Sequence, residues 1–148
     1  MTNTNELYRA RNKALSKTKN ILKKRNKIIK PVKAKDKSLL FADFYMNGIL
    51  CKFKMTRNSQ VNILFEMENN GRTGWFQKTR AKYFVFYIEP EDKIYIIDII
   101  KVKDYISNPL HKVETTKKGT IGDGYSYMIP IRVLLDHNLI KEVIKNNE

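Results

Sequence analysis

The chain has 148 residues and a formal net charge of +14, with 29 Lys and Arg against 15 Asp and Glu. This length fits one domain, and a hydrophobic content of 42% is enough for a buried core. No apolar run approaches the ~18–20 residues that cross a bilayer, and the polar, basic start lacks the apolar region of a secretory signal. Cys51 is the single cysteine, which excludes an intrachain disulfide and a cysteine metal cluster. These features predict a soluble, cytoplasmic protein.

The positive charge is concentrated at the start of the chain. Residues 1–37 hold 13 of the 29 basic residues but only 2 of the 15 acidic ones. Such a segment repels itself unless an anion offsets the charge, and phosphate backbones bind through counterion release. A compositional bias toward Lys, Asn and Ile and an anionic membrane surface are the alternatives. We expect nucleic acid or a ribonucleoprotein as the partner rather than a membrane, since the segment lacks bulky aromatics on its apolar face.

Residues 5–30 are predicted to form one long helix that Pro31 ends, followed by a charged linker over Val32–Ser38. Apolar pairs recur every seven residues and form a narrow stripe, which either packs on the domain or makes a short coiled coil. The remaining faces are basic. Their predicted nucleic-acid-binding residues are Arg9, Arg11, Lys13, Lys17, Lys23, Lys24, Arg25 and Lys27.

The rest of the chain reads as strands followed by a closing helix. Asn47-Gly48 is a strong hairpin signal because both residues tolerate positive φ. The expected strands are 39–46, 49–55, 61–68, 83–88, 94–100 and 125–130, and residues 132–145 are expected to form an amphipathic helix. The prediction is an α+β fold: a long basic N-terminal helix, a mostly antiparallel or mixed sheet of about five strands, and a C-terminal helix. We divide it into an arm with linker, 1–37, and an α+β domain, 38–148.

Two glutamates at the end of the third strand are candidates for chemistry. Glu66 and Glu68 are two residues apart, so a strand places them on one face, roughly 6.5–7 Å apart. Mg²⁺ would relieve their repulsion because it prefers carboxylate oxygens, and Asp43 is the natural third acid. The alternative is a solvated strand end whose glutamates pair with Arg72 or Lys78.

Aromatic residues lie in the following loop. Trp75 and Phe76 stand between Arg72 and Lys78, where they either stack on nucleic-acid bases or fill the core. Both basic residues are included among the predicted nucleic-acid-binding residues.

Several motifs resemble one nuclease family. An acidic strand ending in Glu66-Met67-Glu68 is followed by Thr73-Gly74-Trp75 and by Thr79-Arg80-Ala81-Lys82-Tyr83, and later by Met128-Ile129-Pro130-Ile131 before Leu134. Together they resemble small members of the PD-(D/E)XK nuclease superfamily over residues 39–140. Glu68 replaces the lysine of the family's Glu-x-Lys motif, and Lys82 replaces an aspartate.

The resemblance implies a metal-dependent phosphodiesterase. Asp43 and Glu66 would hold Mg²⁺, a metal-bound water would attack the phosphodiester, and Glu68 would orient or deprotonate that water. The departures from the family pattern leave a second hypothesis equally open. In it the protein is a non-catalytic binder of nucleic acid or ribonucleoprotein from a phage or mobile element, such as an anti-CRISPR-like inhibitor of a host defence nuclease.

Overall fold

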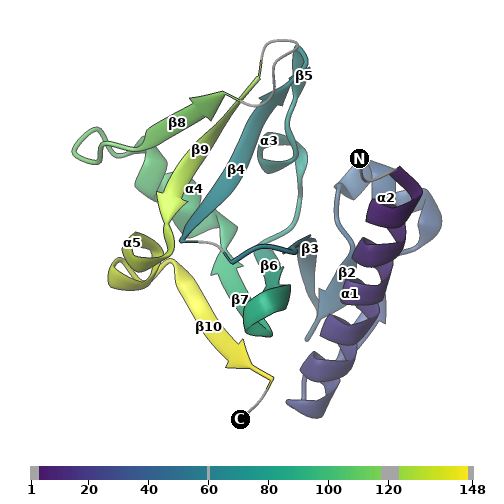
Figure 1. Ribbon diagram of the computed structural model, residues 1–148. Helices are drawn as coiled ribbons and strands as arrows, with labels where there is room; N and C mark the ends of the chain where they lie inside the picture. The colour runs from purple at the N-terminus through teal and green to yellow at the C-terminus, as the bar shows by residue number, and fades with distance from the viewer. Residues whose placement is uncertain (1–3, 60, 118–123, 147–148) are drawn as a thin grey trace.

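The computed structural model describes residues 4–59, 61–117 and 124–146 and forms an α+β fold around two sheets (Figure 1). The larger one, sheet A, is mixed, because β3 and β6 are parallel while its other neighbours are antiparallel. Its six strands, in spatial order, are β1 (Ile29–Pro31), β2 (Phe44–Met46), β3 (Ile49–Thr56), β6 (Tyr83–Ile88), β7 (Lys93–Asp98) and β10 (Ile140–Lys145).

The second sheet, sheet B, is antiparallel and packs against the larger one. In spatial order its strands are β5 (Arg72–Thr73), β4 (Asn62–Asn69), β9 (Tyr125–Pro130) and β8 (Glu114–Lys117). The expectation of about five strands did not include this division into two sheets. The sequence pattern did not predict β10 or the short strands β1, β5 and β8, which have two to four residues each.

Helices cover both faces of sheet A. The long α1 (Thr4–Lys24) lies along one face, while sheet B and three short helices lie on the other (Figure 1). These are α3 (Trp75–Lys78), α4 (Ile99–Ser107) and α5 (Ile131–Asp136), and the remaining helices are α2 (Ala34–Leu40) and the 3₁₀ turn η1 (Glu89–Glu91). Within the described part of the chain, no helix has the length and apolar character needed to span a membrane.

The central strands are apolar because both of their faces are buried. On β7, Ile94 and Ile96 face α1, whereas Tyr95 and Ile97 face sheet B. This strand lies inside the sheet, because β7 pairs with both β6 and β10.

The long helix α1 packs on the domain, the first of the two arrangements that its stripe allowed. Ala14, Ile21 and Leu22 are buried in the same cluster as residues of β2, β3, β6 and β7. The predicted end of the helix at residue 30 is wrong. The chain leaves the helix after Lys24, Asn26 takes a left-handed φ of 67°, and Pro31 belongs to the edge strand β1.

The segment after β1 also differs from the prediction. The expected linker over 32–38 and the first half of the expected strand 39–46 form α2, and only 44–46 are a strand. The predicted boundary at residue 37 therefore lies inside α2, and both β1 and α1 belong to the body that sheet A organises.

The end of the chain is a short helix and a strand rather than one helix over 132–145. α5 ends at Asp136, Asn138 takes a φ of 57°, and Ile140–Lys145 pairs with β7. The C-terminal helix of the predicted fold class is present as α5, and the last strand follows it. The Asn47-Gly48 hairpin is confirmed, with φ of 51° and 78°.

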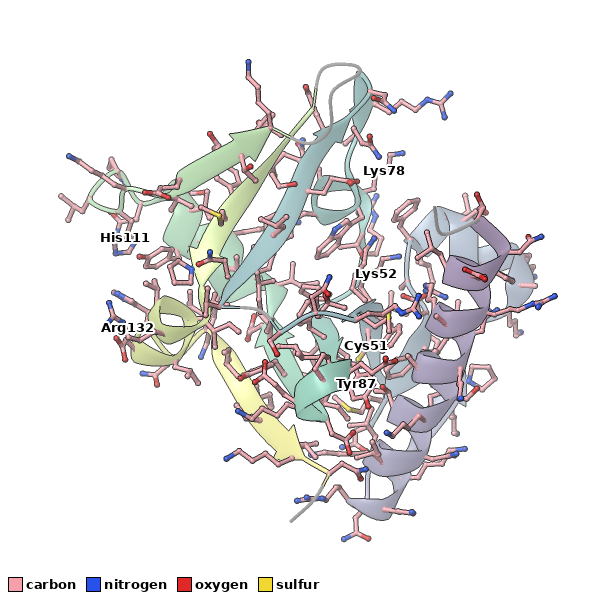
Figure 2. All side chains as sticks on the ribbon, in the orientation of Figure 1. Cys51, Lys52, Lys78, Tyr87, His111 and Arg132 are labelled. Atoms are coloured by element: carbon pink, nitrogen blue, oxygen red, sulfur yellow. The ribbon has the colours of Figure 1, made fainter. Side chains whose placement is uncertain are left out.

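A pH-sensitive cluster joins α1 to the sheet. Asp92 accepts hydrogen bonds from the Tyr87 hydroxyl at 2.8 Å and the Asn146 side-chain amide at 2.9 Å, and lies 3.3 Å from the Lys17 ammonium. Burial alone would raise the pKa of Asp92, but these three partners outweigh it, and the net shift of its pKa is downward. Tyr87 is labelled in Figure 2, beside α1.

We expect this cluster to weaken in acid. Because the folded-state pKa of Asp92 is below its unfolded value, its stabilisation is complete above the unfolded value of ~3.9 and is lost as the pH falls through the folded one. Thermal melts between neutral pH and about pH 3 measure this loss. Asp92→Asn should flatten the acid limb relative to the parent protein, and equal acid sensitivity in both would contradict the assignment.

Candidate nucleic-acid interface

A group of lysines gathers around two aromatic rings on the sheet B side of β3. Lys52 and Lys54 are two residues apart on β3 and so project from the same face of the strand. The Lys52 ammonium lies 4.9 Å from the Phe41 ring centroid, and the Lys54 ammonium lies 5.8 Å from that of Trp75. Phe41 and Lys52 line one hollow of the surface, and Lys54 and Trp75 line another. We call these four residues together with Lys78 the basic cleft.

Lys78 reaches the same ring from a different element. Its ammonium, at the end of α3, lies 5.2 Å from the Phe41 centroid. Figure 2 shows Lys52 and Lys78 between the sheet B side of the molecule and the side formed by α1 and α2, with His111 on the far left. Cations stack on aromatic faces through the ring quadrupole, so Phe41 holds two ammonium groups no more than about 10 Å apart.

Local backbone contacts place Phe41 in this position. Phe41 ends α2 with a left-handed φ of 50°. Its carbonyl accepts a hydrogen bond from the Thr79 hydroxyl at 2.7 Å, and Arg80 N–H donates to the Leu40 carbonyl at 2.8 Å. The ends of α2 and α3 are therefore joined. Thr79 is the residue that follows α3.

Lys52 is a largely buried cation. Its side chain is only 12% exposed. Burial lowers the pKa of Lys52, and the charge of Asp43 only partly counteracts this. A charged group kept in such a place lacks part of the hydration that it would have in water, so a further anion beside it would be bound favourably.

Asp43 is engaged by three protein groups. Its carboxylate accepts hydrogen bonds from the Arg11 guanidinium at 2.7 Å and the Phe53 backbone N–H at 2.6 Å, and lies 3.7 Å from the Lys52 ammonium. These contacts tie α1 to β2 and β3 next to the basic cleft.

Glu66 has a structural partner as well. Its carboxylate accepts a hydrogen bond from the Trp75 backbone N–H at 3.3 Å, at the start of α3. Asp43 and Glu66 both act electrostatically on Lys52, so the two predicted magnesium ligands lie near this lysine. Among the residues that the structure describes, no group of three His, Cys, Asp or Glu side chains is arranged to hold a metal ion.

Glu68 is separated from Glu66 by an irregularity in the sheet. The register between β4 and β9 shifts between these two residues, and Glu68 is exposed beside β5 while Glu66 is half-buried. Arg72, also predicted to bind nucleic acid, lies exposed on β5. The structure thus places Lys78 and Glu66 at the basic cleft, and Glu68 and Arg72 at the tip of sheet B.

The eight predicted basic residues of the N-terminal segment divide into two groups. Four have intramolecular contacts: Arg11 with Asp43, Lys17 with Asp92, Arg25 with the Lys145 carbonyl, and Lys27 with Glu142. The other four are exposed on α1, and they are Arg9, Lys13, Lys23 and Lys24.

Gly74 is required by the close approach of α3 to β4. A Cβ at this position would lie 2.5 Å from the Glu66 carbonyl oxygen. We expect Gly74→Ala to lower the free energy of unfolding by about 1–3 kcal/mol, because the backbones must separate. Chemical denaturation measures the change. Gly48→Ala is the comparison, since a Cβ there meets no atom within 4 Å and only its φ of 78° is unfavourable. An unchanged free energy of unfolding in Gly74→Ala would contradict the steric explanation.

Comparison with protein-family models, with curated proteins and with solved structures finds no match to this chain. The functional assignment therefore rests on the site itself. Lys52, Lys54 and Phe41 are not among the residues predicted from the sequence. The alternation in Cys51-Lys52-Phe53-Lys54-Met55 was the signal, since it places two lysines on one face of a strand and apolar residues on the other.

Proposed function

We propose that this is a cytoplasmic nucleic-acid-binding protein whose basic cleft binds the phosphate backbone, assisted by the exposed basic residues of α1. The observation that supports this most strongly is the pair of ammonium groups, from Lys52 and Lys78, on the single ring of Phe41. Like charges gathered on one surface repel each other, and a polyanion relieves that repulsion while releasing its own counterions. The net charge of +14 favours the same partner at longer range.

A ribonucleoprotein is included in this proposal, because its RNA presents the same backbone. A non-catalytic binder of this kind suits a phage or mobile-element protein that blocks a host defence nuclease. A metal-dependent phosphodiesterase is the second candidate, because Glu66 and Lys54 line one cavity beside the lysines that would hold the substrate.

The binding surface is tested by removing its charge. The variant Lys52→Gln/Lys54→Gln/Lys78→Gln is compared with Lys101→Gln/Lys112→Gln/Lys141→Gln, which changes the net charge equally at three exposed positions elsewhere. If the proposal holds, the slope of log affinity against log salt falls by about 3 in the first variant, because each lost phosphate contact removes about one unit. Anisotropy of labelled oligonucleotides between about 50 and 200 mM salt measures this slope.

The control variant should keep nearly the parent slope. If both triple variants lose the same affinity and the same slope, binding follows overall charge and the basic cleft is not the binding surface. Melting curves of both variants check that each is folded.

Catalysis is tested separately. Labelled DNA and RNA are incubated with the protein in Mg²⁺ or Mn²⁺ and, in parallel, in EDTA. Cleavage that EDTA and Glu66→Ala both abolish would support the phosphodiesterase, whereas binding with no cleavage in either metal supports the non-catalytic protein.

A further inference from the structure

A cavity of about 210 Å³ opens beside the basic cleft, between the two sheets. Three aromatic side chains line it: Trp75 from α3, and Phe84 and Phe86 from β6. Trp75 and Phe84 are core residues with 5% and 1% of their surface exposed, so the accessible ring is that of the half-buried Phe86. Leu64 and Glu66 of β4 and Lys54 of β3 also line the cavity, together with Met55, Thr56, Asn62 and Ser126. The cavity therefore combines an apolar wall with polar groups that include one carboxylate and one ammonium group.

This combination does not suit a phosphate group. A carboxylate inside the cavity would repel an anion. It does suit a nucleobase, one face of which can stack on Phe86 and the edge of which carries hydrogen-bond donors and acceptors. Glu66 is an acceptor when ionised, so it would pair with a base that has an exocyclic amino group.

The position of Glu66 is fixed by the fold. Its carboxylate accepts a hydrogen bond from the Trp75 backbone N–H at 3.3 Å, and the close contact between Gly74 and the Glu66 backbone holds α3 against β4. The carboxylate and the indole ring are consequently held in one arrangement. A preorganised acceptor of this kind loses little entropy when a base binds.

The lysines of the basic cleft lie next to this cavity. Lys54 lines it and places its ammonium 5.8 Å from the Trp75 ring, and Lys52 lies two residues away on the same face, roughly 6.5–7 Å along the strand. Lys78 belongs to the same short helix as Trp75. A strand whose phosphates contact these lysines would have a base within reach of the cavity.

We propose that the cavity binds one unpaired, amino-bearing nucleobase, so that the ligand of the basic cleft is single-stranded nucleic acid. The inference rests on the proposed function and specifies its substrate class. A base in an intact duplex is stacked on both faces and paired along its edge, so it cannot enter the cavity unless it leaves the helix. Cytosine and adenine offer an amino group to Glu66, whereas thymine offers none.

The test uses Trp75, the single tryptophan of the chain, as its reporter. Oligomers of deoxycytidine and of thymidine of equal length, and a duplex, are titrated at pH 7.5 and constant salt, with tryptophan fluorescence and anisotropy recorded together. We expect deoxycytidine oligomers to quench Trp75 and to bind about tenfold more tightly than thymidine oligomers, since good pairing with a base edge discriminates by that order. The duplex should bind least tightly.

The matched variants are Glu66→Gln and Glu68→Gln, which remove the same charge from the same strand. Glu66→Gln should reduce the preference for deoxycytidine to about twofold or less, because an amide donates as well as accepts. Glu68→Gln should leave the preference unchanged, because Glu68 is exposed and does not line the cavity.

The outcomes separate this inference from the proposed function. Salt-dependent binding with unchanged Trp75 fluorescence and equal affinity for both oligomers overturns the base site and leaves backbone binding intact. Tighter binding to the duplex than to either single strand also overturns it. An absence of binding to every ligand overturns the proposed function itself.

Discussion

A truncated protein that lacks α1 is expected to be unfolded at room temperature. The helix contributes Leu22, Ile21 and Ala14 to one of the two core clusters, and each has at most 5% of its surface exposed. Burial of a large apolar side chain is worth about 1.5–3 kcal/mol, and truncation would also expose the sheet residues beneath the helix. Among these, Phe44, Phe53, Val85 and Ile96 are buried in the same cluster. Their combined loss exceeds the ~5–15 kcal/mol by which small domains are stable.

Circular dichroism and size-exclusion chromatography measure this outcome directly. A single-residue version is Leu22→Ala, for which we expect a loss of about 2–5 kcal/mol in the free energy of unfolding. Leu7→Ala on the same helix is the control, since Leu7 is 52% exposed, and its effect should stay within about 0.5 kcal/mol. A truncated chain that melts cooperatively at the parent temperature would show that α1 is a dispensable arm.

The role of α1 in binding is therefore tested by point substitutions and not by truncation. A truncated chain that no longer binds nucleic acid would report the loss of the fold and not the loss of phosphate contacts. The informative positions are the exposed basic residues Arg9, Lys13, Lys23 and Lys24, because the other four contact Asp43, Asp92, Glu142 and the Lys145 carbonyl.

The strands that the sequence predicted well are those with a clear alternation or a strong turn. Residues 83–88 form β6 as expected, and β3, β4 and β9 agree with the predicted ranges within one residue or so. Asn47-Gly48 sets the register of β2 on β3. In these segments the alternation of apolar and polar residues agrees with their burial in the fold, so the sequence pattern alone predicts the strand.

The predictions were wrong where the spacing of apolar residues fits both a helix and a strand. Ile28 and Ile29 continue the seven-residue repeat of α1, yet they lie after Asn26, whose left-handed conformation ends the helix. Residues 140–145 satisfy helical spacing in a similar way, but pairing with β7 makes them a strand. Pairing partners distant in sequence decide such segments, and a short window does not contain them.

The site was harder to predict than the fold. Glu66 and Lys78 were identified and lie at the basic cleft, but Lys52 was not, because its importance comes from Phe41 and Asp43. These neighbours are brought together by α2 and β2, in a region expected to be a linker and one longer strand.

The second large effect is expected for Asp43→Ala. Asp43 is 13% exposed and balances Arg11 and Lys52 while it accepts the Phe53 N–H. Its removal leaves a buried ammonium and a buried N–H without this acceptor, and breaking such a pair costs about 3–5 kcal/mol. Urea denaturation measures the loss. Asp104→Ala is the control because Asp104 is exposed, and it should change stability by no more than about 0.5 kcal/mol.

The same substitution separates two roles of Asp43. If Asp43 served mainly as a metal ligand, the carboxylate would be a source of repulsion in a buffer with EDTA, and its removal would leave the stability unchanged or raise it. If it served to neutralise Arg11 and Lys52, its removal would destabilise the protein equally with and without Mg²⁺. The contacts of 2.6 and 2.7 Å favour the second outcome. A higher melting temperature of Asp43→Ala would contradict the role of Asp43 in neutralising Arg11 and Lys52. It would favour Asp43 as a metal ligand.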